Sequence, residues 1–248
     1  MNARNKSGTV VALSCLIGTM VFAVTLVLAG LGTHVGWWGF RRGLAVLRWS
    51  AYAEAALAAI SLAGCMVSCY RKSFAGLLLS VVAFAIGIVA ISQPVRMWMA
   101  FRTVPMIHDI TTDTENPPTF DALLRLREDA QNPAAYGGAE IAAQQQKAYP
   151  DIVPLFLEAT ADIAFDRSLT AARKLGWEIV RADAGLGIIE ATDTTFWFRF
   201  KDDIVVRITA EGNTSRIDIR SLSRVGKSDV GTNAGRIRTF LAALRKTG

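Results

Sequence analysis

Three long runs of apolar residues dominate the first hundred positions of the chain. They are Thr9–Leu31, Tyr52–Cys69 and Phe74–Ile91, and the first and third contain no charged residue. A helix that crosses the hydrocarbon core of a membrane needs about 20 mostly apolar residues, because its backbone polar groups must be satisfied within the helix. The pattern therefore predicts a transmembrane region over residues 1–102, with helices at about 9–31, 50–70 and 74–94, and a lipid bilayer as its partner.

Polar residues interrupt this region at two places. Residues 34–50 mix tryptophan with arginine, which is typical of an amphipathic segment at the level of the lipid headgroups. Glu54 lies near the start of the second run and close to Arg48. We therefore expect Glu54 at the membrane interface, with that arginine as its local partner.

After residue 91 the pattern changes to short alternating and amphipathic segments. A linker is expected at 103–118, and the α+β domain that follows it spans 119–248, with a first helix at Thr119–Ala130 whose apolar stripe contains Phe120 and Leu123. Period-two alternation and turn residues predict an antiparallel sheet. One amphipathic helix before the sheet and one after it complete a two-layer sandwich of antiparallel sheet and helices, similar to the helix-grip architecture. The expected strands are 153–157, 177–182, 186–192, 196–200, 204–209 and 215–223, and the expected further helices are 139–147, 160–175 and 230–245.

Alternation assigns the side chains of these strands to two faces. Phe196, Phe198 and Phe200, with the isoleucines of the later strands, are expected on the face that the helices cover. The opposite face then carries a cluster of arginines, which could bind an anionic small molecule or an acidic partner. Pairing of these arginines with Asp218 and Glu190 on a solvated face is the simpler interpretation, and Lys201-Asp202-Asp203 is expected to be a hairpin turn. The arginines are Arg199, Arg207, Arg220 and Arg224.

The most polar stretch is RSLSRVGKSDVGTNAGRIRTFL, residues 220–241, between an expected strand and the last helix. It differs from a phosphate-binding loop, because the first required glycine would fall on Ser221 and Asp229 would place negative charge at the phosphate position. Asp229 or Ser228 is better interpreted as the N-cap of the helix. Four residues of this junction are added to the candidate ligand site: Ser228, Asp229, Asn233 and Arg236.

Candidate catalytic groups are sparse. A membrane-bound hydrolase or metal-dependent enzyme would have to use His108 with Asp109, Asp113 and Asp229, and it requires these residues to converge in one pocket. The chain has no GxSxG turn and no CxxC pair. We therefore predict no catalytic residue, no metal site and no cofactor.

Charge is distributed unevenly between the two regions. Residues 1–102 hold nine Lys/Arg and one acid, whereas residues 103–248 hold eighteen Lys/Arg and twenty Asp/Glu. The C-terminal region thus lacks the basic excess of a nucleic-acid-binding domain. Basic residues flank the three runs almost equally, four against five, so the positive-inside rule leaves the orientation open. Arg4 and Lys6 also resemble the start of a secretory signal, but the long first run and the two runs after it favour a retained helix.

Several motifs in a fixed order resemble one protein family. They are IHDITTD, AYPDI, GWEIV, GIIEATDTT, DDIVVRI and RIDIRSLSRVGKSDVGTNAGRIRTFL. Over roughly residues 105–246 the chain resembles the domain of unknown function 1499 family. The resemblance implies no established activity, and it implies an α+β domain on the extracytoplasmic side of a bacterial inner membrane.

The sequence therefore leads to one main hypothesis and two alternatives. The main hypothesis is a non-enzymatic cell-envelope protein, in which three helices tether a domain that binds a ligand or an envelope protein through its arginine-bearing face. The alternatives are the membrane-bound enzyme and a structural subunit of a larger membrane complex. The sequence predicts no particular oligomeric state.

Overall fold

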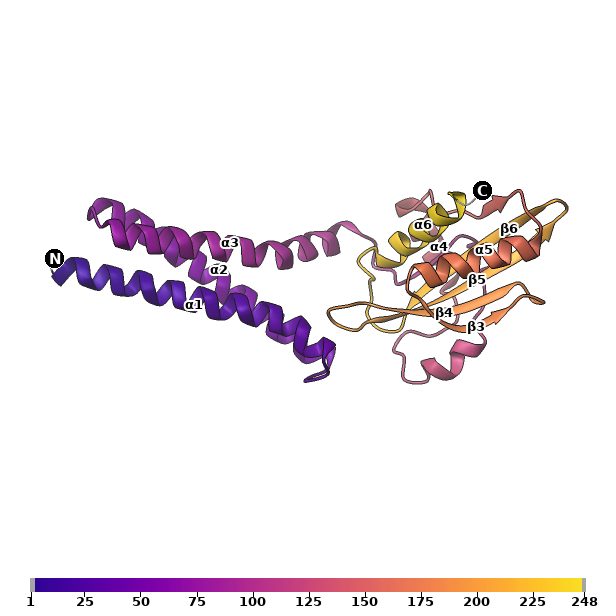
Figure 1. Cartoon of the computed structure of the whole chain (residues 1–248), viewed down its shortest axis with the longest axis horizontal. Helices are drawn as coiled ribbons and strands as arrows, with labels where there is room; N and C mark the ends of the chain where they lie inside the picture. The colour runs from indigo at the N-terminus through magenta and orange to yellow at the C-terminus, as the bar shows by residue number, and fades with distance from the viewer. Residues whose placement is uncertain (1–2, 247–248) are drawn as a thin grey trace. The chain divides into compact units, whose positions relative to one another are not determined.

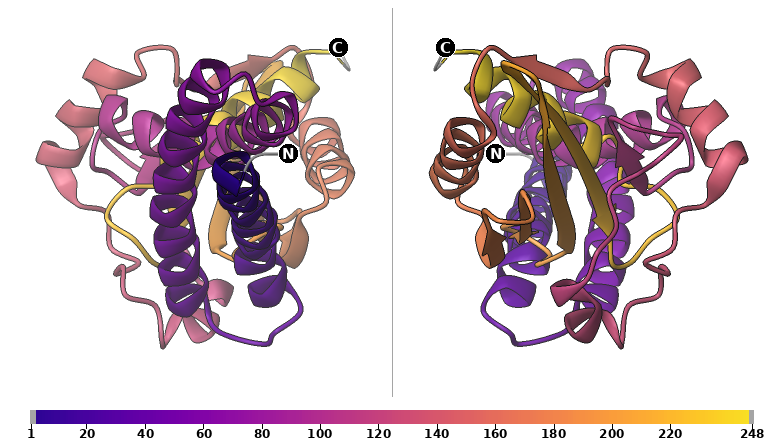
Figure 2. Two further views of the ribbon diagram at one scale, coloured as in Figure 1. Left: turned by 90° about the vertical axis from the view of Figure 1, so that its left-hand side faces the viewer. Right: turned by 90° about the vertical axis from the view of Figure 1, so that its right-hand side faces the viewer.

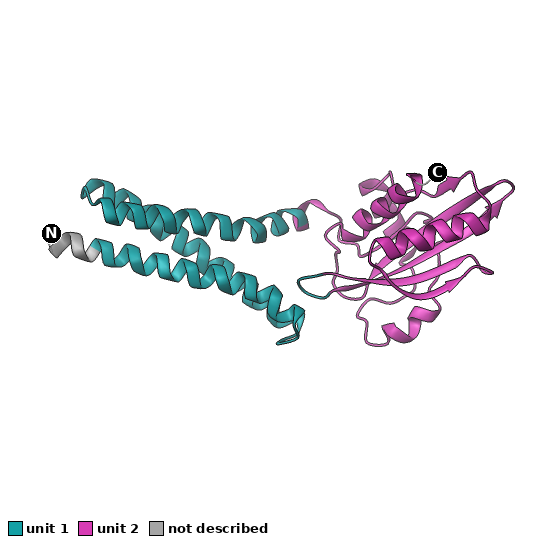
Figure 3. Ribbon diagram, viewed as in Figure 1, with its two compact units in different colours: residues 1–100, 196–199 teal, residues 101–195, 200–248 magenta. Residues whose placement is uncertain are grey.

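The computed structural model describes residues 3–246, with side chains from residue 8 onward, and divides them into two compact units (Figure 3). The first unit, called the helical unit below, comprises residues up to 100 together with 196–199. The second, called the C-terminal domain, comprises residues 101–195 and 200–246 of the described chain. The chain thus has the three apolar helices and the α+β fold that the pattern predicts.

The helical unit is built from three helices that are longer than the apolar runs. They are α1 (Ala3–His34), α2 (Phe40–Tyr70) and α3 (Phe74–Thr103), and all three are long and apolar enough to cross a membrane (Figure 1). Most of the interfacial segment expected at residues 34–50 is in fact the first part of α2. The side chains of Arg4 and Lys6 lie outside the described residues. A tight turn at Lys72, with φ of 53°, joins α2 to α3.

Small residues let the three helices pack closely, and Figure 2 shows the helices alongside one another. A Cβ built at Gly64 would lie 2.8 Å from the Ser80 hydroxyl, and one at Gly87 would lie 3.1 Å from the Ala58 Cβ. A Cβ at Gly43 would clash with Thr33 of α1. Larger residues at these positions would separate the backbones, so glycine sets the helix spacing as it does in membrane bundles.

The C-terminal domain is an antiparallel sheet with strand order β1-β6-β5-β4-β3 and β2 pairing with the other half of β6. The elements are β1 (Asp109–Thr111), η1 (Ala122–Arg127), α4 (Gly138–Ala148), β2 (Leu155–Leu157), α5 (Ala161–Lys174), β3 (Glu178–Asp183), β4 (Ile188–Thr194), β5 (Lys201–Glu211), β6 (Thr214–Ser223) and α6 (Thr232–Arg245). In this sheet Arg207 is opposite Asp218, and Val205 is opposite Arg220. Gly176 ends α5 with φ of 80°, a left-handed conformation that glycine adopts without strain.

One face of the sheet forms the main hydrophobic core with α5 and α6, and Figure 1 shows both helices on the same side of the strands. Ile204, Val206 and Ile208 of β5 point to this face and are buried in one cluster with Phe240 of α6, while Val205 and Arg207 between them point to the other face. Trp177 stacks on Phe240 with ring centroids 5.2 Å apart. The alternation therefore predicted this face correctly for β5 and β6.

The segment 196–200 is a loop, and its assignment as a strand was wrong. Phe200 and Thr195 close the loop through two hydrogen bonds, and Arg199 adopts a φ of 55° that no strand allows. The aromatic residues are therefore not on the helix-covered face. The true strand begins at Lys201, so the expected hairpin at 201–203 is also wrong, and Asp202 and Asp203 are buried on opposite faces of β5.

Two differences concern the segment before the sheet. Residues 109–111, expected in a linker, form the edge strand β1. The helix expected at 119–130 is reduced to the short 3-10 helix η1, of which Leu123 is buried while Leu124 and Leu126 are exposed. η1 contacts the sheet on the side opposite α5 and α6 (Figure 1), so the second face is covered and not solvated.

Candidate functional site

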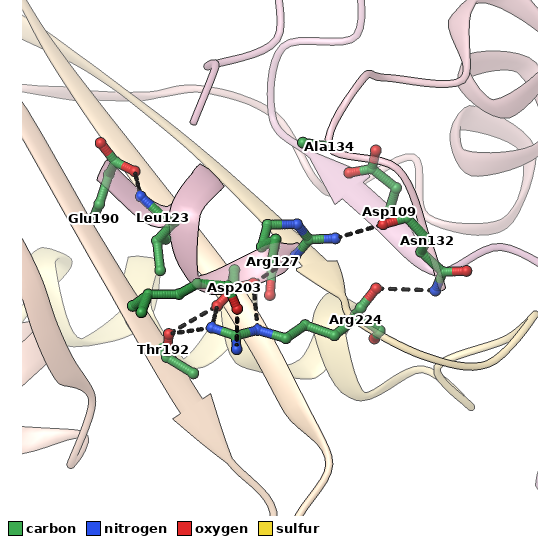
Figure 4. Close-up of polar contacts among 12 residues, drawn as sticks. Asp109, Leu123, Arg127, Asn132, Ala134, Glu190, Thr192, Asp203 and Arg224 are labelled. Atoms are coloured by element: carbon green, nitrogen blue, oxygen red, sulfur yellow. Dashed lines mark hydrogen bonds and ion pairs between the residues drawn. The ribbon is translucent and has the colours of Figure 1, made fainter. Parts of the chain in front are cut away.

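The second face of the sheet is covered by residues 112–136, a segment that we call the strap. A small apolar cluster holds its centre, where Phe120 and Leu123 pack on Val205 and Leu222 of the sheet. Glu190 of β4 accepts hydrogen bonds from the backbone N–H groups of residues 121, 122 and 123, at 3.1, 3.0 and 3.0 Å. One buried carboxylate thus satisfies the first turn of η1, where helix N–H groups lack internal partners (Figure 4).

Arg220 connects two separate parts of the strap, at Pro118 and at Ala134, to strand β1. Its side chain is almost completely buried and forms a bidentate pair with Asp109 of β1, at 2.9 and 2.7 Å. The same guanidinium donates to the carbonyl oxygens of Pro118 and Ala134, at 3.2 and 2.8 Å. Because four of its five N–H donors bind groups of its own chain, Arg220 is largely unavailable to a ligand.

Asp203 is the centre of a second cluster on this face (Figure 4). It accepts hydrogen bonds from Arg127 of the strap, from Thr192 of β4 and from both Nε and Nη2 of Arg224. Arg224 also donates to the carbonyl oxygen of Leu126, at 2.6 Å. Burial lowers the pKa of Arg127, although the neighbouring Asp203 carboxylate opposes this effect. The fully buried carboxylate of Asp203 is thus shared by two guanidinium groups, those of Arg127 and Arg224. Together with Thr192 they connect the strap to β4 and β5.

Arg207 lies nearer the surface of the same face. It donates to Asp218 at 2.9 Å, to Asp113 at 3.1 Å and to the carbonyl oxygen of Asn116 at 3.0 Å. Arg216 binds the same two carboxylates. Arg199 belongs to the 196–200 loop and is exposed, so the structure brings together three of the four predicted arginines.

Arginines and carboxylates alternate on this face. Five arginines lie among five carboxylates, and each of the five donates to at least one of them, while Arg181 of β3 binds Asp121 of the strap. The arginines are Arg127, Arg207, Arg216, Arg220 and Arg224, and the acids are Asp109, Asp113, Glu190, Asp203 and Asp218. The observed arrangement therefore combines the expected cross-strand pairing with a cover that the sequence did not predict.

A separate polar cluster lies on the helix side, at the start of α6. Arg236 donates to Asp193 at 2.8 Å, to Asp202 at 2.7 Å and to Asn233 at 2.6 Å. Asn233 is fully buried and also bonds Ser221 of β6 and the backbone of residue 108. The stretch 220–241 is thus a junction that connects β1, β4, β5, β6 and α6.

The turn before α6 is capped by Asp229 from an unexpected position. The N-cap residue is Gly231, with φ of 80°, and Asp229 accepts the N–H groups of Gly231 and Asn233 at 3.0 and 2.6 Å. The expectation that Asp229 or Ser228 is the N-cap residue itself was therefore wrong, and Asp229 caps the helix from two residues before the observed N-cap. Burial raises the pKa of Asp229, and the two N–H groups partly offset this effect. Ser228 bonds the carbonyl oxygen of Pro105 at 3.1 Å.

The residues of the enzymatic alternative have separate partners. The ring of His108 lies 3.4 Å from the carbonyl oxygen of Lys227, close to the turn that holds Asp229. Asp109 is paired with Arg220, whereas Asp113, at the start of the strap, binds Arg207 and Arg216. Among the described residues there is no group of three His, Cys, Asp or Glu side chains that could hold a metal ion.

Several residues of these clusters were absent from the predicted site. They are Arg127, expected in a helix, Glu190, expected as a pairing residue, Asp202 and Asp203, expected in a turn, and Asp193 and Arg216, which had no expected role. Asp202 and Asp203 carried a usable signal, because continuing the β5 alternation back to Lys201 places the two acids on opposite faces. Arg127 carried none, since its partner is 76 residues away.

A cleft opens beside the strap. Its volume is about 580 Å³, and it lies between residues 114–117 of the strap and α4, with Tyr136 and Gln146 among its lining residues. The Tyr136 ring lies 5.5 Å from the Arg220 guanidinium. The Tyr136 hydroxyl is buried and lacks a hydrogen-bond partner. Burial and the Asp109 carboxylate raise the pKa of Tyr136 to about 12, so this hydroxyl is a neutral donor at physiological pH.

Fold and site together define a class of protein: an α+β domain with a strap clasped over its sheet by ion pairs, attached to three long apolar helices. Residues 109–244, more than half of the chain, match the family described as "Protein of unknown function (DUF1499)", and the chain belongs to that family. No curated protein matches the chain.

Proposed function

We propose that this chain is an integral protein of the bacterial inner membrane, whose three helices anchor a ligand- or partner-binding domain on the extracytoplasmic side. The observation that carries the proposal is the outer surface of the helices. Large apolar side chains such as Val10, Tyr70 and Val89 are more than 60% exposed there. A surface of this kind is stable in lipid and costly in water.

The distribution of charge supports the same division. The helical unit carries its charges mainly at the helix ends, whereas the C-terminal domain buries its charged groups in pairs. A domain that satisfies its own buried charges is compatible with water on its remaining surface. The family resemblance supports the extracytoplasmic side, with the α2–α3 turn at Arg71 and Lys72 then facing the cytoplasm.

Protease protection in spheroplasts tests the anchoring and the orientation. External protease should remove the C-terminal domain from intact spheroplasts and leave the helices in the membrane pellet after alkaline washing. A C-terminal domain that is degraded only after lysis would reverse the orientation. Full-length protein released by the alkaline wash would contradict membrane insertion itself.

The binding site that we propose is the cleft beside the strap. Tyr136 lines this cleft, and its buried hydroxyl has no partner among the described residues, so a ligand oxygen that displaced the cover and reached it would recover about 1–3 kcal/mol. The ligand class is a small molecule that presents a carboxylate, phosphate or carbonyl oxygen to Tyr136. Gln146 and Thr114, which bond each other at 3.0 Å, form part of the rim.

The predicted arginines enter this proposal as positioning residues. Arg220 supports the Tyr136 ring, and Arg207 holds the strap at residues 113–116, which border the cleft. Arg224 fixes the middle of the strap, while Ser228, Asp229, Asn233 and Arg236 hold the junction behind β1. Arg199, on its exposed loop, remains a candidate for direct contact with a partner.

Filling the cleft tests the binding proposal. Full-length protein is purified from its native membranes, and the small molecules that co-purify are identified by mass spectrometry. Ala142→Trp places a bulky ring in the cleft and should remove a molecule that the wild type retains. Leu126→Trp, at an exposed position of η1 outside the cleft lining, is the matched control and should retain it. The same set of molecules on all three proteins would contradict the cleft as the site.

A further inference from the structure

Glu54 occupies a position that the sequence pattern did not predict. Helix α2 begins at Phe40, so Glu54 lies 14 residues into a helix of 31, about 21 Å along its axis. The residue is completely buried. Arg48, the expected partner, instead has its guanidinium 5.6 Å from the centroid of the Trp49 ring. The Arg48 pairing expected for Glu54 is therefore wrong.

The surroundings of Glu54 are small and apolar. A Cβ built at Gly87 of α3 would lie 3.1 Å from Ala58 and 3.6 Å from the Glu54 Oε1, so the carboxyl group lies at the α2–α3 contact. Both carboxyl oxygens lack a hydrogen-bond partner. On the facing helix, Thr19 is fully buried beside Gly18, which packs on Leu57, and its hydroxyl also lacks a partner.

An ionised carboxylate cannot remain in this position without compensation. Moving an unpaired carboxylate into a low-dielectric interior costs several kcal/mol even after relaxation, and such groups are neutralised instead. A metal ion would supply the charge but needs about six oxygen ligands. Helices α1 and α2 use their carbonyl groups internally around this site, and among the described residues of the helical unit the Thr19 and Ser61 hydroxyls are the only further buried side-chain oxygens without partners. A proton needs no such coordination shell.

We propose that Glu54 is a proton-binding site inside the three-helix bundle, which holds its carboxyl group neutral at pH 7 and exchanges the proton with solvent. The inference depends only on the helical unit and is independent of the ligand proposed for the C-terminal domain.

A cavity in the same bundle covers part of a route for exchange. Its volume is about 320 Å³, enough for roughly ten water molecules at liquid density. It reaches from Arg71 and Ser73, at the α2–α3 turn, to Ser61, and its mainly apolar lining includes four serine residues, Ser61, Ser68, Ser73 and Ser80. Ser61 lies seven residues after Glu54 on the same face of α2, about 10 Å away along the axis. Exchange is therefore expected from the side of the α2–α3 turn.

Infrared difference spectroscopy on the full-length protein in lipid tests the protonation state. At pH 7 the wild type should show the carbonyl band of a protonated carboxyl group, and Glu54→Gln should lose this band while retaining its helical content. Glu54→Asp should restore a shifted band. Glu140→Gln, an exposed acid in α4, is the control and should leave the spectrum unchanged. A wild-type spectrum without a band that Glu54→Gln removes would overturn the proposal.

The route is tested by the rate at which this band shifts after transfer into D₂O. Ser61→Leu should fill the inner end of the cavity and slow the shift without removing the band. Met66→Leu, at an exposed position on the same helix outside the cavity lining, should leave the rate unchanged. An exchange rate that is equal in all three proteins would overturn the cavity as the route.

Discussion

The two units of this protein treat buried charge in opposite ways. In the C-terminal domain, Asp203 is completely buried, and two arginines and a threonine donate to it. In the helical unit, Glu54 is just as buried and has no donor among the described residues. The first arrangement holds a chain segment in place, because removing any member leaves a charge without compensation. The second joins no two segments through an ion pair, which is why we propose a role for Glu54 that depends on its protonation. The comparison teaches that burial of a charged residue has no single meaning until its partners are known.

The largest effect is expected from breaking the Asp203 cluster. Asp203→Ala leaves Arg127 and Arg224 without their carboxylate and should lower the free energy of unfolding by about 3–5 kcal/mol. Chemical denaturation of the full-length protein in detergent measures this change. Asp162→Ala, an exposed acid in the first turn of α5, is the control and should change stability by less than about 0.5 kcal/mol. A loss below about 1 kcal/mol for Asp203→Ala would show that the cluster does not hold the strap.

The next largest effect is a difference in stability among alanine variants of the predicted arginines, and it follows how deeply each arginine is buried. Arg220→Ala leaves Asp109 unpaired and should cost about 3 kcal/mol, with faster hydrogen exchange over residues 112–136. Arg207→Ala, at a partly exposed position, should cost about 1 kcal/mol. Arg199→Ala should be nearly neutral. If all three substitutions left exchange in the strap unchanged, the arginine face would be free for a partner, as the sequence alone suggested.

Removing the buried acid of the helical unit should stabilise the protein, whereas removing that of the C-terminal domain destabilises it. Glu54→Met replaces an unpartnered acid with an apolar side chain of similar length, and it should raise the free energy of unfolding by about 1 kcal/mol or more. Thermal melting in one detergent compares it with the wild type. Asp203→Leu, the corresponding change in the C-terminal domain, should lower the melting temperature. A lower melting temperature for Glu54→Met would indicate an internal partner of Glu54 and would remove the contrast between the units.

The smallest effect is a pH dependence from Asp229. Because burial raises its pKa in the folded state, the stability linked to its protonated form is present at low pH and is lost as the pH rises from about 4 through the folded pKa. The stability of the wild type relative to Asp229→Asn should therefore fall between pH 4 and pH 7. Asp151, whose pKa is lowered by the hydrogen bond to Arg238, should give a small change of opposite sign and at lower pH, because the stability of the wild type relative to Asp151→Asn is lost as the pH falls below about 4. A constant difference across this pH range would contradict the raised pKa of Asp229.

Local patterns predicted most of the elements because the physics behind them is local. The three apolar runs exceed the length of a membrane span, and the alternation of Ile204, Val206 and Ile208 needs only the two-residue period of a strand. Local patterns gave the wrong structure at residues 196–200. Aromatic residues with high strand propensity form a loop there, which hydrogen bonds between Thr195 and Phe200 close. Strand propensity could not predict that β5 begins only at Lys201, because Asp202 and Asp203 by themselves favour a turn. They are accommodated in the strand because Arg236 and Arg224, which are distant in sequence, pair with them.

The sequence by itself determined the division into apolar helices and a mixed α+β domain, the helix-covered face of the sheet, and the presence of arginines on the other face. The groups that those arginines bind and the surroundings of Glu54 became known only from the folded chain. The cause is the sequence separation between the interacting residues. Hydrophobic periodicity is a property of neighbouring residues, whereas the pairs Arg127–Asp203 and Arg220–Asp109 join positions 76 and 111 residues apart. The neutral or charged state of a buried group depends on such distant partners, and no local pattern contains them.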